Sequence, residues 1–466
     1  MTQHQPHDVP DQDLTVTYAS YPPPSVAWYA TIMMAVLYWL ALLDRFIISL
    51  MIDPIKADLG LTDVQFGLLQ GIAFILSFTF FGFIFGAFAD WKDRRRLIFI
   101  GVSVWSLATI ACGLAQNFWQ LLSARAGLGA GEASLNPSAT SMISDLFPPQ
   151  RLTFAMSVYA VGATIGGGTA LILGGYIVSW ASGLGDVVFP VIGSIAPWQM
   201  TFFIVGAPGI LLASLVFTFP EPVRLGRSAT ALKRSGNGLN TYRDLLTFIR
   251  GHLRFFLAHY GGFTIAAGLV SGCVGWYPVH MMRAYDWTES QVGMYLGLTI
   301  LSAGIAGKFV GGLSVDAMYR KGYRDAQLRW FGACLFLAAP MGVFGATSDS
   351  PWLFLILIGL FTALLTSLHA CAMSSLNMVT PNQLRGAGVA TWSTISGLAG
   401  GSIGAVLVPV FSQWFSDPTT AIGYGMATFM ATAAPIAGVA MFVGMKPMRR
   451  ALGSALYPEA NAVDNS

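Results

Sequence analysis

Long apolar stretches dominate this sequence and limit the folds open to it. Of its 466 residues, 55% are hydrophobic and only 10% are charged. Many apolar runs are about 20 residues long, which is the length an α-helix needs to cross the hydrocarbon core of a bilayer. Outer-membrane barrels show alternating segments of about ten residues instead. The sequence therefore predicts an all-α membrane protein. We place twelve predicted spans near residues 28–52, 64–89, 97–116, 118–143, 152–180, 198–219, 251–282, 290–315, 329–346, 352–378, 386–415 and 420–445.

Positive charges lie mostly on one side of these predicted spans. Of the 25 Lys and Arg residues, only Lys56 and Arg283 fall in connections on the opposite side, and three fall within spans. Cytoplasmic connections of membrane proteins are enriched in Lys and Arg. We therefore expect a multi-pass protein of the cell (inner) membrane with both termini in the cytoplasm. The basic loops are interpreted as topology signals, and no nucleic-acid partner is expected.

A short pattern follows the second predicted span and recurs after the eighth. It consists of a glycine, a carboxylate four residues later, and arginine close behind. The residues are Gly86, Asp90, Arg94 and Arg95 in the first copy, and Gly312, Asp316 and Arg320 in the second. Recurrence at this spacing indicates two homologous six-helix halves. The predicted organisation is a flexible cytoplasmic tail (1–27), an N-terminal six-helix bundle (28–219), a cytoplasmic linker (220–250), a C-terminal six-helix bundle (251–445) and a cytoplasmic tail (446–466).

Twelve spans in two halves with this loop pattern resemble the major facilitator superfamily of secondary transporters. The resemblance covers essentially the whole chain outside the two tails, and one departure is Asp93, where the family usually has glycine. It implies the major facilitator fold and alternating access. We expect a cytoplasmic gate in which carboxylates pair with the arginines after them or with a neighbouring helix N-terminus. The predicted gate residues are Asp90, Arg94, Arg95, Asp316 and Arg320.

Three segments resemble the Spinster-like branch of that superfamily, whose animal members move lysophospholipids and sphingosine phosphate. They are Asp44-Arg45-Phe46, Ala124-Arg125-Ala126-Gly127-Leu128-Gly129-Ala130-Gly131-Glu132-Ala133-Ser134 and Ile143-Ser144-Asp145-Leu146-Phe147. A glutamate in the setting of Glu132 also occurs in organic-anion symporters. The Spinster likeness implies an amphipathic anionic substrate.

Five charged residues lie within the predicted spans: Asp44, Arg45, Arg125, Glu132 and Lys308. Each costs roughly 2.5–3.5 kcal/mol at the centre of a membrane helix, so each should pair or face water. Arg125 and Glu132 lie on one helix face about 10.5 Å apart along the axis, too far to pair well with each other. We expect Asp44 to pair with Arg125, and Arg45 to pair with Glu132.

A buried cluster of both signs suits a proton-coupled carrier. Burial favours the neutral form of a carboxyl group and a nearby arginine favours the charged form, so separating the two lets the carboxyl group take a proton. We predict proton coupling at Asp44 and Glu132. Substrate binding is predicted at Arg45 and Arg125, because arginine stays charged and binds anions bidentately. The structural alternative is a network of salt bridges that only orients the helices.

Aromatic and small residues complete the prediction. Tyr159 and His369, in the fifth and tenth spans, are predicted to contact substrate. Glycine runs in the fifth and eleventh spans predict close helix packing. The sequence has no short-spaced metal ligands and no nucleophile with a base, so we expect no metal, no cofactor and no enzymatic activity.

These features predict a proton-coupled secondary transporter of a lysophospholipid-like or sphingosine phosphate-like anion, working as a monomer in the bilayer. Two alternatives keep the same fold. One is a proton symporter of a small organic anion such as a sugar acid, and the other is a multidrug efflux pump.

Overall fold

The fold is described from a computed structural model. The structure describes residues 21–147, 149–189, 193–223, 238–381 and 384–456. Residues 1–20 and 457–466 of the predicted tails and residues 224–237 of the predicted linker lie outside these ranges. The boundaries of the predicted halves stay a prediction.

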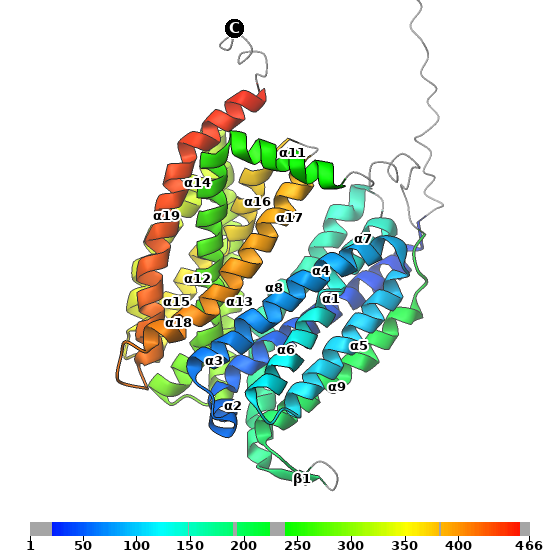
Figure 1. The fold of residues 1–466 in the computed structure, drawn as a ribbon, viewed down its shortest axis with the longest axis vertical. Helices are drawn as coiled ribbons and strands as arrows, with labels where there is room; N and C mark the ends of the chain where they lie inside the picture. The colour runs from blue at the N-terminus through cyan, green and yellow to red at the C-terminus, as the bar shows by residue number, and fades with distance from the viewer. Residues whose placement is uncertain (1–20, 148, 190–192, 224–237, 382–383, 457–466) are drawn as a thin grey trace, which may run out of the picture.

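The helices before the linker pack mainly against one another, with α1 along α8, α5 along α6 and α9, and α4 along α6 (Figure 1). Their bounds are α1 (Pro24–Ile47), η2 (Ile48–Leu50), α2 (Ile52–Leu59), α3 (Asp63–Leu68), η3 (Leu69–Ala73), α4 (Phe74–Trp91), α5 (Arg94–Gly113), α6 (Phe118–Glu132), α7 (Leu135–Leu146), α8 (Pro149–Leu184), α9 (Pro197–Ser214) and η4 (Leu215–Thr218).

The helices after the linker form a second group, in which α19 packs along α12 and α14, and α15 along α13 and α14. Their bounds are α11 (Gly238–Gly251), α12 (Leu253–Tyr285), α13 (Glu289–Arg320), α14 (Ala326–Ala346), α15 (Pro351–Leu365), α16 (Leu368–Val379), α17 (Arg385–Ile395), η7 (Ser396–Gly401), α18 (Ser402–Ser412) and α19 (Ala421–Leu456). Helix α11 lies at the end of the predicted linker.

Eleven helical segments among the described residues are long and apolar enough to cross a membrane. The fourth predicted span is not among them; it is divided into α6 and α7, as the tenth is divided into α15 and α16. Between α6 and α7, the Ser134 hydroxyl donates to the Gly131 carbonyl at 2.9 Å. Such a bond competes with the backbone ladder of a helix. The predicted span is thus two shorter helices, of which α6 carries Arg125 and Glu132.

Helices α3 and α13 begin with the same capping box, which extends the internal repeat. Thr62 accepts from the backbone of Gln65, whose side chain accepts from the Thr62 backbone. Thr288 and Gln291 do the same at the start of α13. Each box satisfies N–H groups that a helix start leaves without partners. The offset in numbering from Thr62 to Thr288 equals that from Asp90 to Asp316.

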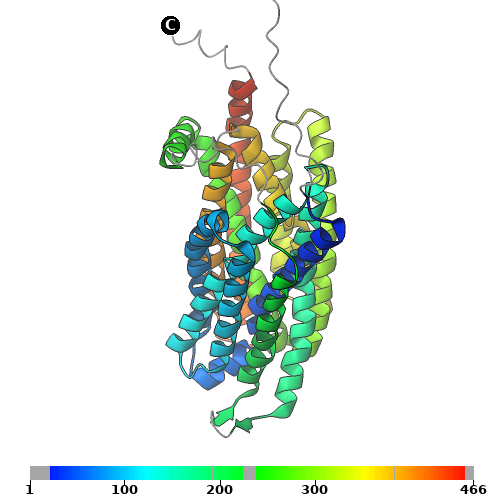
Figure 2. The same ribbon diagram turned by 90° about the vertical axis from the view of Figure 1, so that its right-hand side faces the viewer.

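The two ends of the bundle differ. We call one the hairpin face, because it carries the antiparallel strands β1 (Val187–Phe189) and β2 (Gly193–Ile195). Helix α2 lies at this end as well (Figure 1). The opposite end carries α11 and is called the linker face. Figure 2 shows the hairpin and α11 at opposite ends of the long axis.

The two helix groups meet chiefly where α8 packs on α13 and α3 packs on α18. Small residues make the first contact close: a Cβ atom at Gly168 would lie 2.7 Å from the Gly297 carbonyl oxygen. At the second, a Cβ atom at Gly67 would lie 2.8 Å from the Ala405 carbonyl oxygen. The predicted role of the glycines in the fifth span, close helix packing, is confirmed at Gly168.

Candidate functional site

Charged side chains from α1 and α6 come together inside the first helix group. Arg45 Nη2 lies 2.5 Å from Glu132 Oε2. The Glu132 side chain is 2% exposed and that of Arg45 is 33% exposed. The expected pairing of these two residues is confirmed. Because the pair holds α1 against α6, a change in the spacing of these helices would act directly on it.

Asp44 and Arg125 are buried but do not form the expected direct pair. Neither carboxylate oxygen of Asp44 and none of the three guanidinium nitrogens of Arg125 has a hydrogen-bond partner within 3.5 Å among the described residues. Consecutive helix residues point roughly 100° apart, so α1 cannot aim both side chains at α6. Arg45 meets α6, while the Asp44 carboxylate lies beside Trp105 and Thr109 of α5. The two charges interact only at longer range.

Phe74 connects the two arginines and was not predicted. The guanidinium carbon of Arg45 lies 4.5 Å from the centre of the Phe74 ring, and that of Arg125 lies 5.6 Å from it. Both are cation–π distances. Phe74 follows η3, a π-helical segment, and segments of this kind are frequent at functional sites. In the sequence, Phe74 is one of many aromatic residues in an apolar span, so the pattern holds no signal for this role.

The other predicted substrate residues lie in different surroundings. The Tyr159 hydroxyl donates to Asn136 Oδ1 at 2.5 Å, and its ring stacks on Tyr38 at 5.2 Å. His369 belongs to α16 in the second helix group, where its ring meets Trp392 edge-on at 5.7 Å. Their predicted contact with substrate stays a prediction.

Arg94 and Arg95 have partners other than the expected ones. Arg94 is fully buried and binds Asp145 at 2.5 Å and Glu221 at 2.7 Å. Arg95 donates to the Phe219 carbonyl at 2.7 Å. These bonds join the starts of α5 and of the linker to the end of α7. Sequence reasoning missed Glu221, which lies just beyond the sixth predicted span.

Asp316 and Arg320 do not form the expected pair with each other. Asp316 and Arg320 are both exposed at the end of α13, and within the described part of the chain no ion pair joins them. Asp90 belongs to the last turn of α4, but its side chain lies outside the described residues. The gate role of all these residues stays a prediction.

Asp93 starts helix α5. Its Oδ1 accepts from the backbone N–H of Arg95 at 2.9 Å and of Arg96 at 3.2 Å. Partial burial opposes ionisation, but bonds from Arg96 and Arg95 outweigh it and hold the pKa of the Asp93 carboxyl below its usual range. The departure from glycine at this position therefore supplies an N-cap.

A second charged cluster joins the helix groups at the hairpin face. Arg283 of α12 binds Asp53 of α2 at 2.5 Å and Asp63 of α3 at 2.9 Å. Lys56 also binds Asp63 at 2.5 Å. By contrast, the ion pairs of Arg94 with Asp145 and Glu221 stay within the first helix group and its linker. Arg283 and Lys56 are the two cations predicted to lie in connections on the side of the membrane opposite to most Lys and Arg residues. This exceptional placement was the sequence feature that pointed to the cluster.

Proteins of similar sequence identify the family of this chain. Residues 34–324 match the model of the Major Facilitator Superfamily. An MFS-type efflux pump of Mycolicibacterium smegmatis is 25% identical over 91% of this chain and 94% of its own. Protein spinster homolog 1 of Xenopus tropicalis is 28% identical over 61% of this chain and 54% of its own, and a probable L-galactonate transporter of Escherichia coli is 26% identical over 62% and 61%.

Solved structures show the same fold. A bacterial homolog of the human lysosomal transporter Spinster, inward-facing and unoccupied, superposes with a TM-score of 0.81 at 23% identity over 92% of this chain and 99% of that one. The fold and the family match together define a multi-pass membrane transporter. The chain belongs to the major facilitator superfamily, and its likeness within that family is to the Spinster-like branch.

Proposed function

We propose that this secondary transporter moves an amphipathic anion, lysophospholipid-like or sphingosine phosphate-like, across the membrane by alternating access, coupled to protons. The observation that carries the proposal is Arg125, a fully buried guanidinium with no hydrogen-bond partner in the described part of the chain. A buried charge without a partner is costly. Such a cation is retained where an anionic ligand supplies the missing bonds.

Asp44 is the proposed proton site. Its two oxygens have no hydrogen-bond partner within 3.5 Å among the described residues, Trp105 and Thr109 lie beside them, and Glu132 and Arg125 are the charges that act on Asp44. Protonation of Asp44 removes the counter-charge of Arg125, whose full positive charge then favours an anionic head group. Release of the head group restores the attraction between Arg125 and Asp44 and favours loss of the proton.

The Arg45–Glu132 pair is proposed as the second coupled element. Arg45 is one-third exposed and Glu132 is buried, so the pair has one side that a ligand can reach. An anion that binds Arg45 competes with Glu132, and Glu132 then takes a proton. Charge is conserved in this exchange, since one anion and one proton enter a site that keeps its two arginines.

We further propose that the linker face is cytoplasmic and that the structure represents an inward-facing state. The positive-inside pattern supports the orientation. The Arg283 cluster closes the hairpin face, which would then lie outside.

A small organic anion is the second candidate substrate. It is favoured by relatives that include the probable L-galactonate transporter of Escherichia coli and a hexuronate transporter of Bacillus subtilis, 24% identical over 61% of this chain. A sugar acid would use the same arginines but would need polar groups rather than apolar walls around the rest of the molecule.

Thermal stabilisation by ligands separates these candidates. Purified protein would be heated with lysophosphatidylglycerol, with galactonate and with a cationic dye. We expect the lysolipid to raise the melting temperature of the wild type and to lose most of that effect in Arg125→Gln. Arg324 is an exposed arginine in the turn between α13 and α14. The variant Arg324→Gln serves as the control and should respond as the wild type does. Stabilisation by galactonate alone would support the sugar-acid candidate, and equal stabilisation of Arg125→Gln by the lysolipid would contradict the proposed site.

A further inference from the structure

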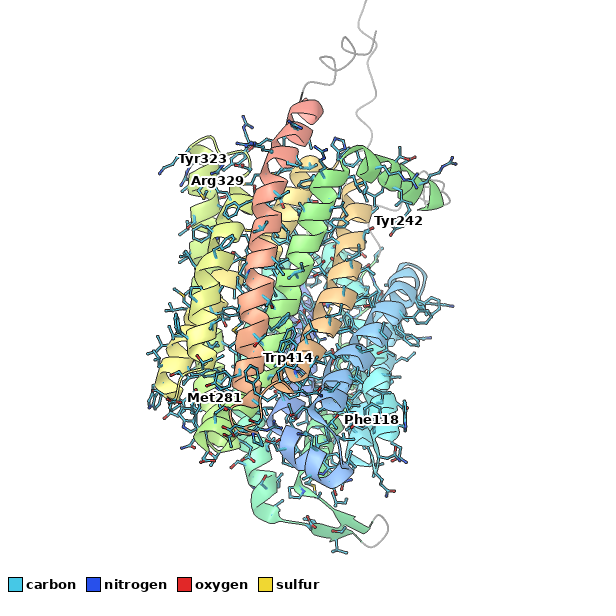
Figure 3. The ribbon with its side chains drawn as sticks, turned by 60° about the vertical axis from the view of Figure 1, so that its left-hand side comes forward. Phe118, Tyr242, Met281, Tyr323, Arg329 and Trp414 are labelled. Carbon is cyan, nitrogen blue, oxygen red and sulfur yellow. The ribbon has the colours of Figure 1, made fainter. Side chains whose placement is uncertain are left out.

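A groove of about 1270 Å³ lies between α12 and α19, near the linker face and outside the charge cluster. The two helices run side by side (Figure 3). Small residues hold them close, since a Cβ atom at Gly444 would lie 3.0 Å from Ala258 Cβ. The groove is lined by residues of α11, α12 and α19, all of the second helix group.

The part of the groove toward the middle of the bundle is apolar. Leu257 of α12 is 65% exposed there, and Val439 and Val443 of α19 are 53% and 63% exposed. Val439 and Val443 are one turn apart on one helix face. Exposed aliphatic side chains at this depth suit the acyl chains of a lipid.

The part of the groove toward the linker face is cationic. Arg250, Arg254, Lys446 and Arg450 line it and are all exposed. No carboxylate is among the residues that line the groove, and none of these four cations has an ion pair with a described residue. Both helix walls thus change from apolar to cationic at the same end.

Two further details concentrate positive charge at this end. Helix α12 begins at Leu253 without a side-chain cap, so its N-terminal N–H groups add partial positive charge beside Arg254. Arg449 points to a different partner, since it lies 3.7 Å from Asp325. The cationic end therefore keeps its charge available for an anion.

We propose that this groove is a binding site for an anionic phospholipid of the leaflet at the linker face. The phosphate binds the four cations and the N-terminus of α12, and the acyl chains lie along the apolar walls. Basic pockets between membrane helices with adjoining apolar surface recognise anionic lipid head groups in this way. The site is separate from the transport site, because its walls belong to one helix group.

The test counts bound lipids on the full-length protein. Purified protein would be titrated with phosphatidylglycerol or phosphatidylcholine and studied by native mass spectrometry. We expect the wild type to retain phosphatidylglycerol in preference to phosphatidylcholine. The triple variant Arg254→Gln, Lys446→Gln, Arg450→Gln should bind phosphatidylglycerol roughly 100-fold more weakly, since each basic residue near a membrane surface contributes about fivefold to anionic lipid binding.

Control variants test whether the loss of lipid binding is specific to this groove. Arg151→Gln, Lys321→Gln, Arg324→Gln removes three exposed cations that do not line the groove and should bind the lipid as the wild type does. Val443→Trp should weaken binding by filling the apolar part, whereas Val310→Trp, at another exposed position, should not. Equal binding by the first triple variant and the wild type would overturn the proposal. So would binding that appears only after residues 457–466 are removed, because those residues would then be the occupant.

Discussion

At the scale of single residues, the adjacent charges Asp44 and Arg45 of α1 contact two different helices, α5 and α6. Arg45 reaches Glu132 of α6, while Asp44 faces α5 and keeps both oxygens without a hydrogen-bond partner among the described residues. The sequence predicted the first contact from the cost of charge in a membrane. The sequence could not predict that Asp44 faces α5, because the rotation of α1 about its axis depends on packing rather than on residue spacing.

The Arg45–Glu132 pair makes a prediction about stability. Arg45→Gln leaves the buried Glu132 carboxylate without its cation and should lower the unfolding free energy by roughly 1–3 kcal/mol. Adding Glu132→Gln removes the stranded charge and should recover part of that loss. Thermal unfolding followed by tryptophan fluorescence measures both. A double variant less stable than each single variant would contradict a coupled pair.

The Asp93 cap makes a prediction about pH. Asp93→Ala should cost about 1 kcal/mol, and Asp93→Asn much less, because the amide oxygen still accepts from the start of α5. The pKa of Asp93 is lower in the folded protein, so its charge stabilises the fold above the ordinary aspartate range and that benefit is lost as pH falls through the folded pKa. Melting temperatures of the wild type and Asp93→Ala should therefore converge in acid. A constant difference down to pH 3 would argue against an ionised cap.

At the scale of elements, the helix groups are joined by two kinds of contact. Glycine faces let α8 approach α13, which the sequence predicted from the glycine run of the fifth span. The second is the Arg283 cluster, whose parts are far apart in the sequence. Only the fold brings α12 onto α2 and α3, so the sequence pattern did not predict these ion pairs.

Removing Arg283 should loosen the hairpin face. Arg283→Gln removes the cation that α12 contributes to this cluster, so the attraction that holds α12 to Asp53 of α2 and Asp63 of α3 is lost. Spin labels placed on α2 and α12 would report a longer distance distribution than in the wild type. Arg324→Gln should leave the distribution unchanged. An unaltered distribution in Arg283→Gln would show that the cluster does not hold this face closed.

At the scale of the whole molecule, hydropathy and the repeated loop pattern were enough for the fold. The span boundaries followed from the length of apolar runs, and the family match confirmed the fold that they predicted. The division of the fourth span into α6 and α7 was not predicted; the helix is interrupted at the two residues between Glu132 and Leu135, where the Ser134 hydroxyl donates to the Gly131 carbonyl. The ion pair between Arg94 and Glu221 was not predicted, because Glu221 belongs to the predicted linker.

The central claim is that the buried cluster of α1 and α6 couples an anion to protons. The most direct test is flux of radiolabelled lysophospholipid in proteoliposomes with and without an imposed pH gradient. We predict that a pH gradient drives flux in the wild type, and that Asp44→Asn folds and binds the lipid but no longer responds to the gradient. The same gradient-driven flux in Asp44→Asn and Glu132→Gln as in the wild type would contradict the coupling role of this cluster.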